Sequence, residues 1–355
     1  MSFLTDEEAA SLRLARMSLH IVGGDEEFEP QPELPVEHDD FLLDLLRSIA
    51  SDSVYKFAER SNTRTTIEAI ATRLTPFDEG AQALAQDFCR LHIGRVKDGA
   101  FFVFELGVAD DGVNIYALVK YDYSQALEIV HREGQTGLRR IVEAFVSDRN
   151  AIQKSAIVRT RNGQAEVSIS TRDRMGRPSP LLTEYFQNYL QVVRERDDQE
   201  LTAEVKEVVR QTLKDHKEFL PRGGLAVSVA RANDVLRAAP EINEDVIRQA
   251  VWVGAGQPDD DELKAKLDAA VDRSVRKKKL AGLAFAPSAA ALPRSLRRTV
   301  TTVEGVRIEY DTSLEGQAFE RQDLGDGRTR FVVTTRSYTD DVIAERTGRA
   351  TRQLD

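Results

Sequence analysis

The stretch GAFFVFELGVADDGVNIYALVKY occupies residues 99–121 and decides the fold class of the first half of the chain. Its two apolar runs, Gly99–Gly107 and Val113–Tyr121, are rich in β-branched and aromatic residues, which favour strands. Between them lies Asp110-Asp111-Gly112, a turn sequence, because aspartate and glycine tolerate the backbone conformations of tight turns. The stretch therefore predicts an antiparallel strand pair.

Further strands and helices are predicted on both sides of this pair. Apolar alternation predicts strands at 12–22, 155–160 and 166–171, the last two joined by the turn Arg161-Asn162-Gly163. Helical spacing after a capping aspartate predicts one helix from Asp39 or Asp40 to about Ile49. The same pattern predicts a second helix from Asp78 to about Leu91, with Gly94 ending it. Residues 1–171 are therefore predicted to form an α+β domain of antiparallel hairpins and packing helices.

Helical spacing dominates the chain after residue 171. The predicted helices are 179–195, 201–219, 226–237, 243–253 and 259–279. They define a mainly helical domain over 172–283, with a basic loop at its start. A linker and small C-terminal strands, 300–311 and 328–335, follow within 284–338, and a polar tail covers 339–355. The predicted fold class is thus α+β, with antiparallel hairpins and packing helices first, a mainly helical region next and a small C-terminal strand unit last.

Composition restricts the class of protein. A chain of 355 residues with 41% hydrophobic and 30% charged residues is typical of a folded, cytoplasmic protein of two domains. No apolar run is long enough to span a membrane, and the N-terminus lacks a signal-peptide pattern. The only cysteine, Cys89, excludes an intrachain disulfide.

The charges are distributed unevenly, although the net charge is −10. Residues 25–44 are strongly acidic and could face a protein partner. Three basic groups are candidates for contacting DNA phosphates. They are Arg172, Arg174 and Arg177; Arg273, Arg276, Lys277, Lys278 and Lys279; and Arg294, Arg297 and Arg298. The second group is also explained by the preference of cations for a helix C-terminus.

The first basic group belongs to the segment STRDRMGRPSPLLTEYFQNYLQVV, residues 170–193. A flexible basic loop, with Gly176 and Pro178 around Arg177, leads into an apolar-aromatic helix. The loop offers donors for phosphate. The aromatic face, with Tyr185, Phe186 and Tyr189, is either a partner-binding face or part of the core.

The same segment resembles the bacterial nucleoid-associated proteins of the NdpA type. The matching residues are Gly176, Arg177, Tyr185, Phe186 and Leu190, and the strands RMSLHIV (16–22) and GVRIEYD (305–311) also agree in order and position. The resemblance implies a bacterial protein of the cytoplasm and nucleoid. It would bind double-stranded DNA through phosphates, with little sequence preference and no catalysis.

Catalytic patterns are incomplete in the sequence. Glu105 and Lys120 have the residue types of a metal-dependent nuclease, but Leu118 stands where such a site needs an acid. We therefore expect these two residues to form an exposed cross-strand pair. The five histidines lack metal-binding spacing, His20 is expected to face solvent, and no cofactor is predicted.

Two alternatives to DNA binding stay open at this point. One is an interaction protein of a chromosome-maintenance or phage-defence assembly, and the weaker one is a diverged metal-dependent nuclease. The sequence also leaves a homodimer open.

Overall fold

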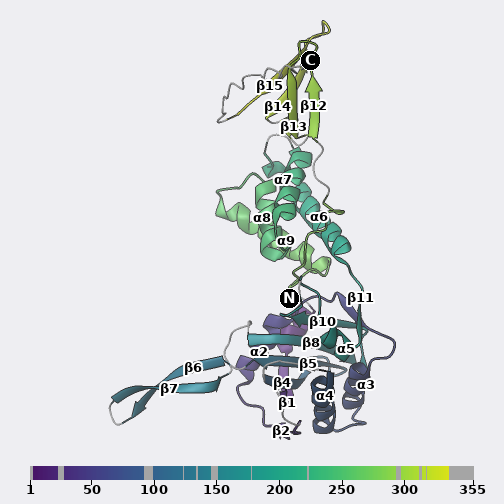
Figure 1. Cartoon of the computed structure of the whole chain (residues 1–355), viewed down its shortest axis with the longest axis vertical. Helices are drawn as coiled ribbons and strands as arrows, with labels where there is room; N and C mark the ends of the chain where they lie inside the picture. The colour runs from purple at the N-terminus through teal and green to yellow at the C-terminus, as the bar shows by residue number, and fades with distance from the viewer. Residues whose placement is uncertain are drawn as a thin grey trace, which may run out of the picture.

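The chain folds into an antiparallel sheet with helices, a helical middle region and small C-terminal strand pairs, as Figure 1 shows. The fold class predicted from the sequence, α+β, is confirmed. The computed structural model describes residues 3–22, 28–91, 99–122, 124–132, 135–144, 151–176, 178–221, 224–292, 297–311, 314–316 and 318–335.

The main sheet has the strand order β11-β3-β10-β8-β5-β4-β1-β2, with β9 paired to β8, and every neighbouring pair in it is antiparallel. The predicted central pair is present, with Phe102 opposite Val119. The strands are β1 Arg13–Val22, β2 Glu33–Leu34, β3 Tyr55–Phe57, β4 Gly99–Gly107, β5 Val113–Asp122, β8 Ile152–Arg161, β9 Gln164–Ala165, β10 Ser168–Asp173 and β11 Val192–Arg194.

Helices cover both faces of this sheet, so its central strands are buried on both sides. The helices of this region are α1 Asp6–Ser11, α2 Asp39–Ile49, α3 Asn62–Ala71, α4 Phe77–Leu91 and α5 Glu184–Leu190. Helices α3, α4 and α5 pack on the face that carries Phe101, whereas α1 and α2 pack on the face that carries Phe102. The expectation that His20 faces solvent is wrong, because α4 covers that side of β1 and buries the ring completely.

An additional hairpin, not expected from the sequence, leaves the sheet between β5 and β8. Strands β6 Ser124–Arg132 and β7 Gln135–Ala144 pair with each other and project away from the sheet in Figure 1.

The middle region consists of helices, as predicted. They are α6 Asp198–Asp215, a short 3-10 helix Lys217–Phe219, α7 Gly224–Ala238, α8 Glu244–Gly254 and α9 Asp261–Lys277. Asp197, Asn243 and Asp260 cap three of them through side-chain bonds to backbone N–H groups. Beyond this region, β12 Arg297–Thr301 pairs with β13 Arg307–Asp311, and β14 Phe319–Asp323 pairs with β15 Thr329–Val333.

The predicted helix 179–195 is much shorter than expected. Only α5, Glu184–Leu190, is helical, because Thr183 is tied to Asp173 and Gln191 takes a left-handed conformation with φ 51°. The chain then returns to the sheet as β11. The sheet therefore extends to Arg194, well past residue 171, where the predicted first domain ended. Gly94 and the tail 339–355 lie outside the described residues.

Within the described part of the chain, no helix combines the length and the apolar character that a membrane span requires.

Candidate nucleic-acid interface

The basic loop after β10 is anchored on one buried carboxylate, that of Asp173. Its Oδ1 accepts hydrogen bonds from the backbone N–H groups of Met175 (2.9 Å) and Gly176 (3.2 Å). Its Oδ2 accepts from the backbone N–H (2.8 Å) and the hydroxyl (2.7 Å) of Thr183. A Cβ at Gly176 would lie 1.8 Å from the carbonyl oxygen of Leu181, so only glycine fits there. The loop is thus pinned at both ends.

Lys154 completes this anchor from the neighbouring strand. Its Nζ donates to Asp173 Oδ1 at 2.6 Å and to Thr183 Oγ1 at 2.9 Å, and it lies 4.5 Å from the ring centre of Tyr185. Burial lowers the pKa of Lys154, and the bond to Asp173 opposes that shift. In the register of the sheet, Lys154 of β8 lies between Lys120 of β5 and Asp173 of β10. A row of three buried charged residues therefore crosses three strands.

The arginines of the loop differ in their surroundings. Arg174 is exposed and lies 3.5 Å from Asp122. Arg172 is half-buried on β10, opposite Ser155. Arg177 lies outside the described residues. Of the two described arginines of this group, Arg174 is the more exposed.

The second basic group forms an exposed cluster at the end of α9, which we call the α9 basic cluster. Its members are Arg273, Arg276, Lys277, Lys278 and Lys279, all exposed. Arg276 forms an ion pair with Asp6 at 3.4 Å, and the other four have no ion-pair partner among the described residues. The guanidinium of Arg196 donates to the carbonyl of Lys279 at 2.6 Å and so holds the backbone in place.

Contacts through Ser51 and Asp52 link the segment after the α9 basic cluster to β10, the strand that leads into the basic loop. The backbone N–H of Ser51 donates to Ser170 Oγ on β10 at 3.1 Å. The next residue, Asp52, accepts from the N–H of Ala281 at 2.8 Å, and its own N–H donates to the Ala281 carbonyl at 2.8 Å. The cluster ends at Lys279, two residues before Ala281. These contacts tie the segment that follows the α9 basic cluster to β10, where the helical region joins the sheet (Figure 1).

The third basic group is separate from the other two. Arg298 lies on β12, is exposed and forms an ion pair with Glu315 at 2.7 Å. Arg297 begins the same strand, and Arg294 lies outside the described residues. This strand is at the opposite end of the helical region from the sheet in Figure 1.

The aromatic residues of α5 belong mainly to the core. Phe186 is 1% exposed and Tyr189 is 3% exposed, and both rings pack edge-on against Phe88 of α4. Tyr185 is half-buried beside them. In this structure the face formed by Phe186 and Tyr189 is turned into the protein and is not available to a partner.

The expected exposed pair of Glu105 and Lys120 is also wrong, because both residues are buried and each has another partner. Glu105 pairs with Arg73 at 2.6 Å, and Lys120 pairs with Asp122 at 2.8 Å. In the register of β4 and β5, Glu105 is opposite Tyr116, four residues from Lys120. Among the described residues, no group of three His, Cys, Asp or Glu side chains is placed to hold a metal ion.

Asp52 makes the contact between the sheet and the helical region sensitive to pH. Burial raises the pKa of Asp52 to about 6, and the hydrogen bond from the Ala281 N–H and then the charges of Arg196 and Lys279 oppose this shift less strongly. The pKa of this carboxyl is 3.8 in the unfolded chain and about 6 in the folded protein. Its contribution to stability is therefore complete below pH 3.8 and is lost as the pH rises through about 6. Asparagine at position 52 does not ionise. We therefore expect the free energy of unfolding of Asp52→Asn, relative to that of the wild type, to increase by about 3 kcal/mol as the pH rises from 4 to 7. Urea unfolding across this range measures the difference, and a constant difference would contradict the prediction.

Lys154, Asp173, Thr183 and Asp52 were not predicted from the sequence as parts of the site. Asp173 alone carried a signal, since it interrupts the arginines of the basic loop. Comparisons of the chain with models of protein families and with curated proteins found no match.

Proposed function

We propose that the protein binds double-stranded DNA through its phosphates, largely without sequence preference and without catalysis, as a nucleoid-associated protein. The observation that carries the proposal is the α9 basic cluster, in which four of five exposed cations have no described carboxylate as ion-pair partner. Such cations release counterions from DNA when they meet phosphates, which gives affinity without base readout. The resemblance to NdpA-type proteins supports the same function.

The geometry around the cluster also supports this proposal. Arg196 fixes the backbone that carries Lys278 and Lys279, and Asp173 fixes the loop that carries Arg174. Cations held on a fixed backbone lose less conformational freedom when they bind a phosphate. The exposed cations of the cluster and the loop provide a local positive surface. The protein as a whole has a net charge of −10, which by itself would repel DNA.

Neutralising three cations of the cluster should weaken DNA binding and reduce its dependence on salt. For the variant with Arg273→Gln, Lys277→Gln and Lys278→Gln, we expect a shallower log–log slope of affinity against salt. The slope should change by about 0.9 for each phosphate that the variant no longer neutralises. Fluorescence anisotropy with labelled duplexes of two unrelated sequences, across a salt titration, measures both affinity and sequence preference.

The matched control changes two cations near the start of the same helix. Lys264 and Lys266 are ion-paired with Asp261 and Glu262, so Lys264→Gln with Lys266→Gln should leave DNA affinity nearly unchanged. Equal weakening in both variants, a flat salt response, or no binding at low salt would each remove the proposal. Cleavage of the duplex by the wild type in magnesium or manganese would remove its non-catalytic part.

A further inference from the structure

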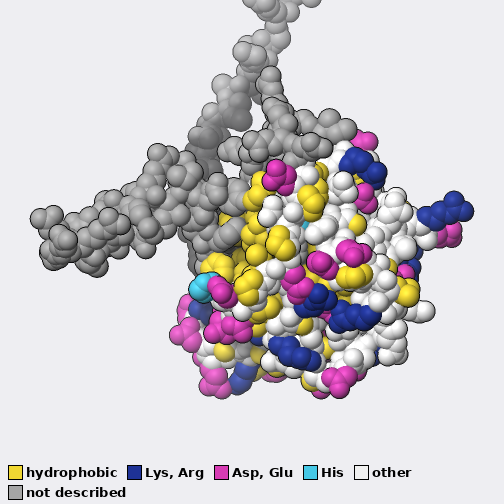
Figure 2. Space-filling view, turned by 90° about the horizontal axis from the view of Figure 1, so that it is seen from below, with side chains coloured by type: hydrophobic (Ala, Val, Ile, Leu, Met, Phe, Trp, Pro, Cys, Tyr) yellow, Lys and Arg dark blue, Asp and Glu magenta, His cyan; other side chains and the backbone are white. Residues whose placement is uncertain are grey.

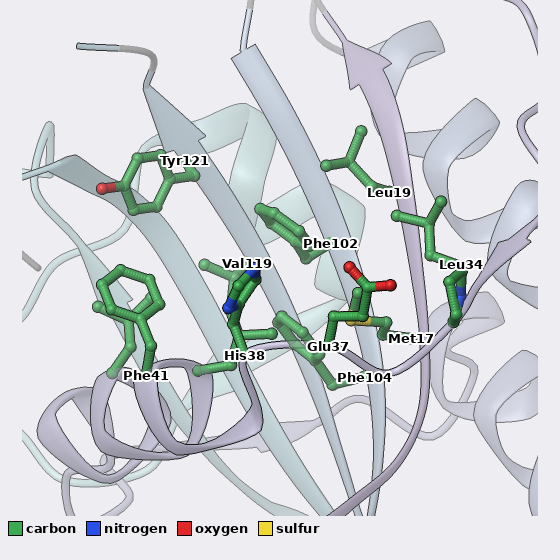
Figure 3. Close-up of a pocket in the computed structure, with 13 residues that line it drawn as sticks. Met17, Leu19, Leu34, Glu37, His38, Phe41, Phe102, Phe104, Val119 and Tyr121 are labelled. Carbon is green, nitrogen blue, oxygen red and sulfur yellow. The ribbon is translucent and has the colours of Figure 1, made fainter. Parts of the chain in front are cut away.

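Helix α2 leaves an apolar groove open on the sheet face opposite α3, α4 and α5. The groove has a volume of about 470 Å³ and lies between α2 and strands β1, β4 and β5. Phe102, Phe104, Val119 and Tyr121 of β4 and β5 form its floor, and Phe41 of α2 stands at its side (Figure 3). Figure 2 shows hydrophobic side chains gathered in a hollow on this face.

The rim of the groove is acidic where α2 begins. Glu37 lines the groove, and Asp39 and Asp40 follow it in the first turn of α2. All three are exposed, and none of them forms an ion pair with a described residue. His38 adopts a left-handed backbone conformation, φ 56°, and no side-chain bond caps the helix there. In Figure 3 the side chain of Glu37 lies at the groove together with that of His38. The rim therefore has one carboxylate at the groove, that of Glu37, and two more beside it at the start of α2.

This charge pattern selects among the possible occupants of the groove. A fatty acid or a nucleic acid would bring its own negative charge against Glu37, Asp39 and Asp40, which is unfavourable. A second copy that docked the same face would place two acidic rims together. A segment with apolar side chains and neighbouring lysines or arginines satisfies both the floor and the rim.

We propose that the groove docks a segment of another protein that carries large apolar side chains flanked by lysine or arginine. The apolar side chains cover Leu19, Leu34 and Phe41, which line the groove and are partly exposed, and the cations pair with the acidic residues beside it. Binding of an amphipathic helix in an apolar groove is a common mode of recognition of this kind. The volume lies within the range of about 300–1,000 Å³ that is usual for ligand pockets. The proposal does not depend on DNA binding, which would use other residues.

Anisotropy of synthetic peptides with the full chain tests the proposal. The probe is a short fluorescein-labelled peptide in which pairs of leucines alternate with pairs of lysines. One comparison peptide has glutamate for every lysine, and another has serine for every leucine. We expect the first peptide to bind and both comparison peptides to bind at least about tenfold more weakly. Binding of the glutamate peptide, or of the serine peptide, as strongly as the first would overturn the proposal.

Two groove variants and their controls localise the binding. Phe41→Glu places a charge at the side of the groove, and Glu37→Lys with Asp40→Lys reverses the rim. Each should weaken binding by about tenfold or more while thermal melting shows a folded protein. Leu74→Glu, at an apolar residue that is 82% exposed elsewhere, and Glu59→Lys with Asp111→Lys, at exposed acids elsewhere, serve as controls and should not weaken it.

Unchanged binding by both groove variants would overturn the proposal, because Glu37→Lys with Asp40→Lys alters only exposed side chains. Light scattering after size exclusion tests for a second copy as the occupant. A wild-type dimer that Phe41→Glu converts to a monomer would assign the groove to self-association and would also overturn the proposal.

Discussion

Replacing Asp173 by asparagine should lower the free energy of unfolding by about 3–5 kcal/mol, because it leaves the Lys154 ammonium buried without its carboxylate. Asp173 also accepts hydrogen bonds from Met175, Gly176 and Thr183, so the ends of the basic loop lose their common anchor. Urea unfolding of the variant and the wild type gives the difference in free energy.

The double variant Lys154→Met with Asp173→Asn isolates the ion pair from the rest of the network. It should lose less stability than the sum of the two single variants, since removing both charges leaves no buried ion unpaired. Asp110→Asn is the matched control, because its carboxylate pairs with Arg161 at 3.2 Å on the surface and should contribute at most about 1 kcal/mol. Additive effects of the two single substitutions, or an equal effect at Asp110, would show that the Lys154–Asp173 pair does not anchor the loop.

Local patterns were sufficient to predict the fold class, the central strands of the sheet and the long helices of the middle region. They did not predict α1, α3, the β6–β7 hairpin or β14, and the predicted strand 300–311 is wrong, because residues 302–306 turn the chain between β12 and β13. The β4–β5 pair follows from two apolar runs around a turn sequence, and the cap at Asn243 matches the predicted start of its helix. Both signals depend on neighbours in the sequence. The predicted helix 179–195 is wrong at its start. Asp173 binds the backbone N–H of Thr183, ten residues later in the chain, and the helix begins only after Thr183. Such a contact leaves no periodic pattern in the sequence.

Contacts between distant residues also explain what could not be predicted of the site. Alternation along β1 and β5 suggests solvent-facing His20 and Lys120, but helices on both faces of the sheet bury them. The approach of the α9 basic cluster to β10 depends on Asp52, which lies 229 residues before Ala281 in the chain. The sequence identified the basic groups by composition alone, whereas the place of each group in the fold depends on tertiary packing.

Truncation of Phe186 to alanine should cost about 3–5 kcal/mol of unfolding free energy. The ring is 1% exposed, lies parallel to Tyr189 with ring centres 6.2 Å apart, and meets Phe88 edge-on at 6.4 Å. Its removal leaves a cavity between α5, α4 and the sheet. It also removes a ring whose centre lies 5.3 Å from the ammonium of Lys154, so the anchor of the basic loop is less well packed. Thermal and urea unfolding measure the change.

The same substitution at an exposed phenylalanine separates a core role from a surface role. Phe219 is 43% exposed at the end of the 3-10 helix, so Phe219→Ala should cost much less than Phe186→Ala. A Phe186→Ala protein that melts like the wild type would mean that the aromatic face of α5 is not part of the core. The interpretation of this face as a partner-binding surface would then replace its interpretation as part of the core. A large destabilisation by Phe186→Ala with intact melting of Phe41→Glu would instead leave the groove beside α2 as the exposed apolar surface for protein binding.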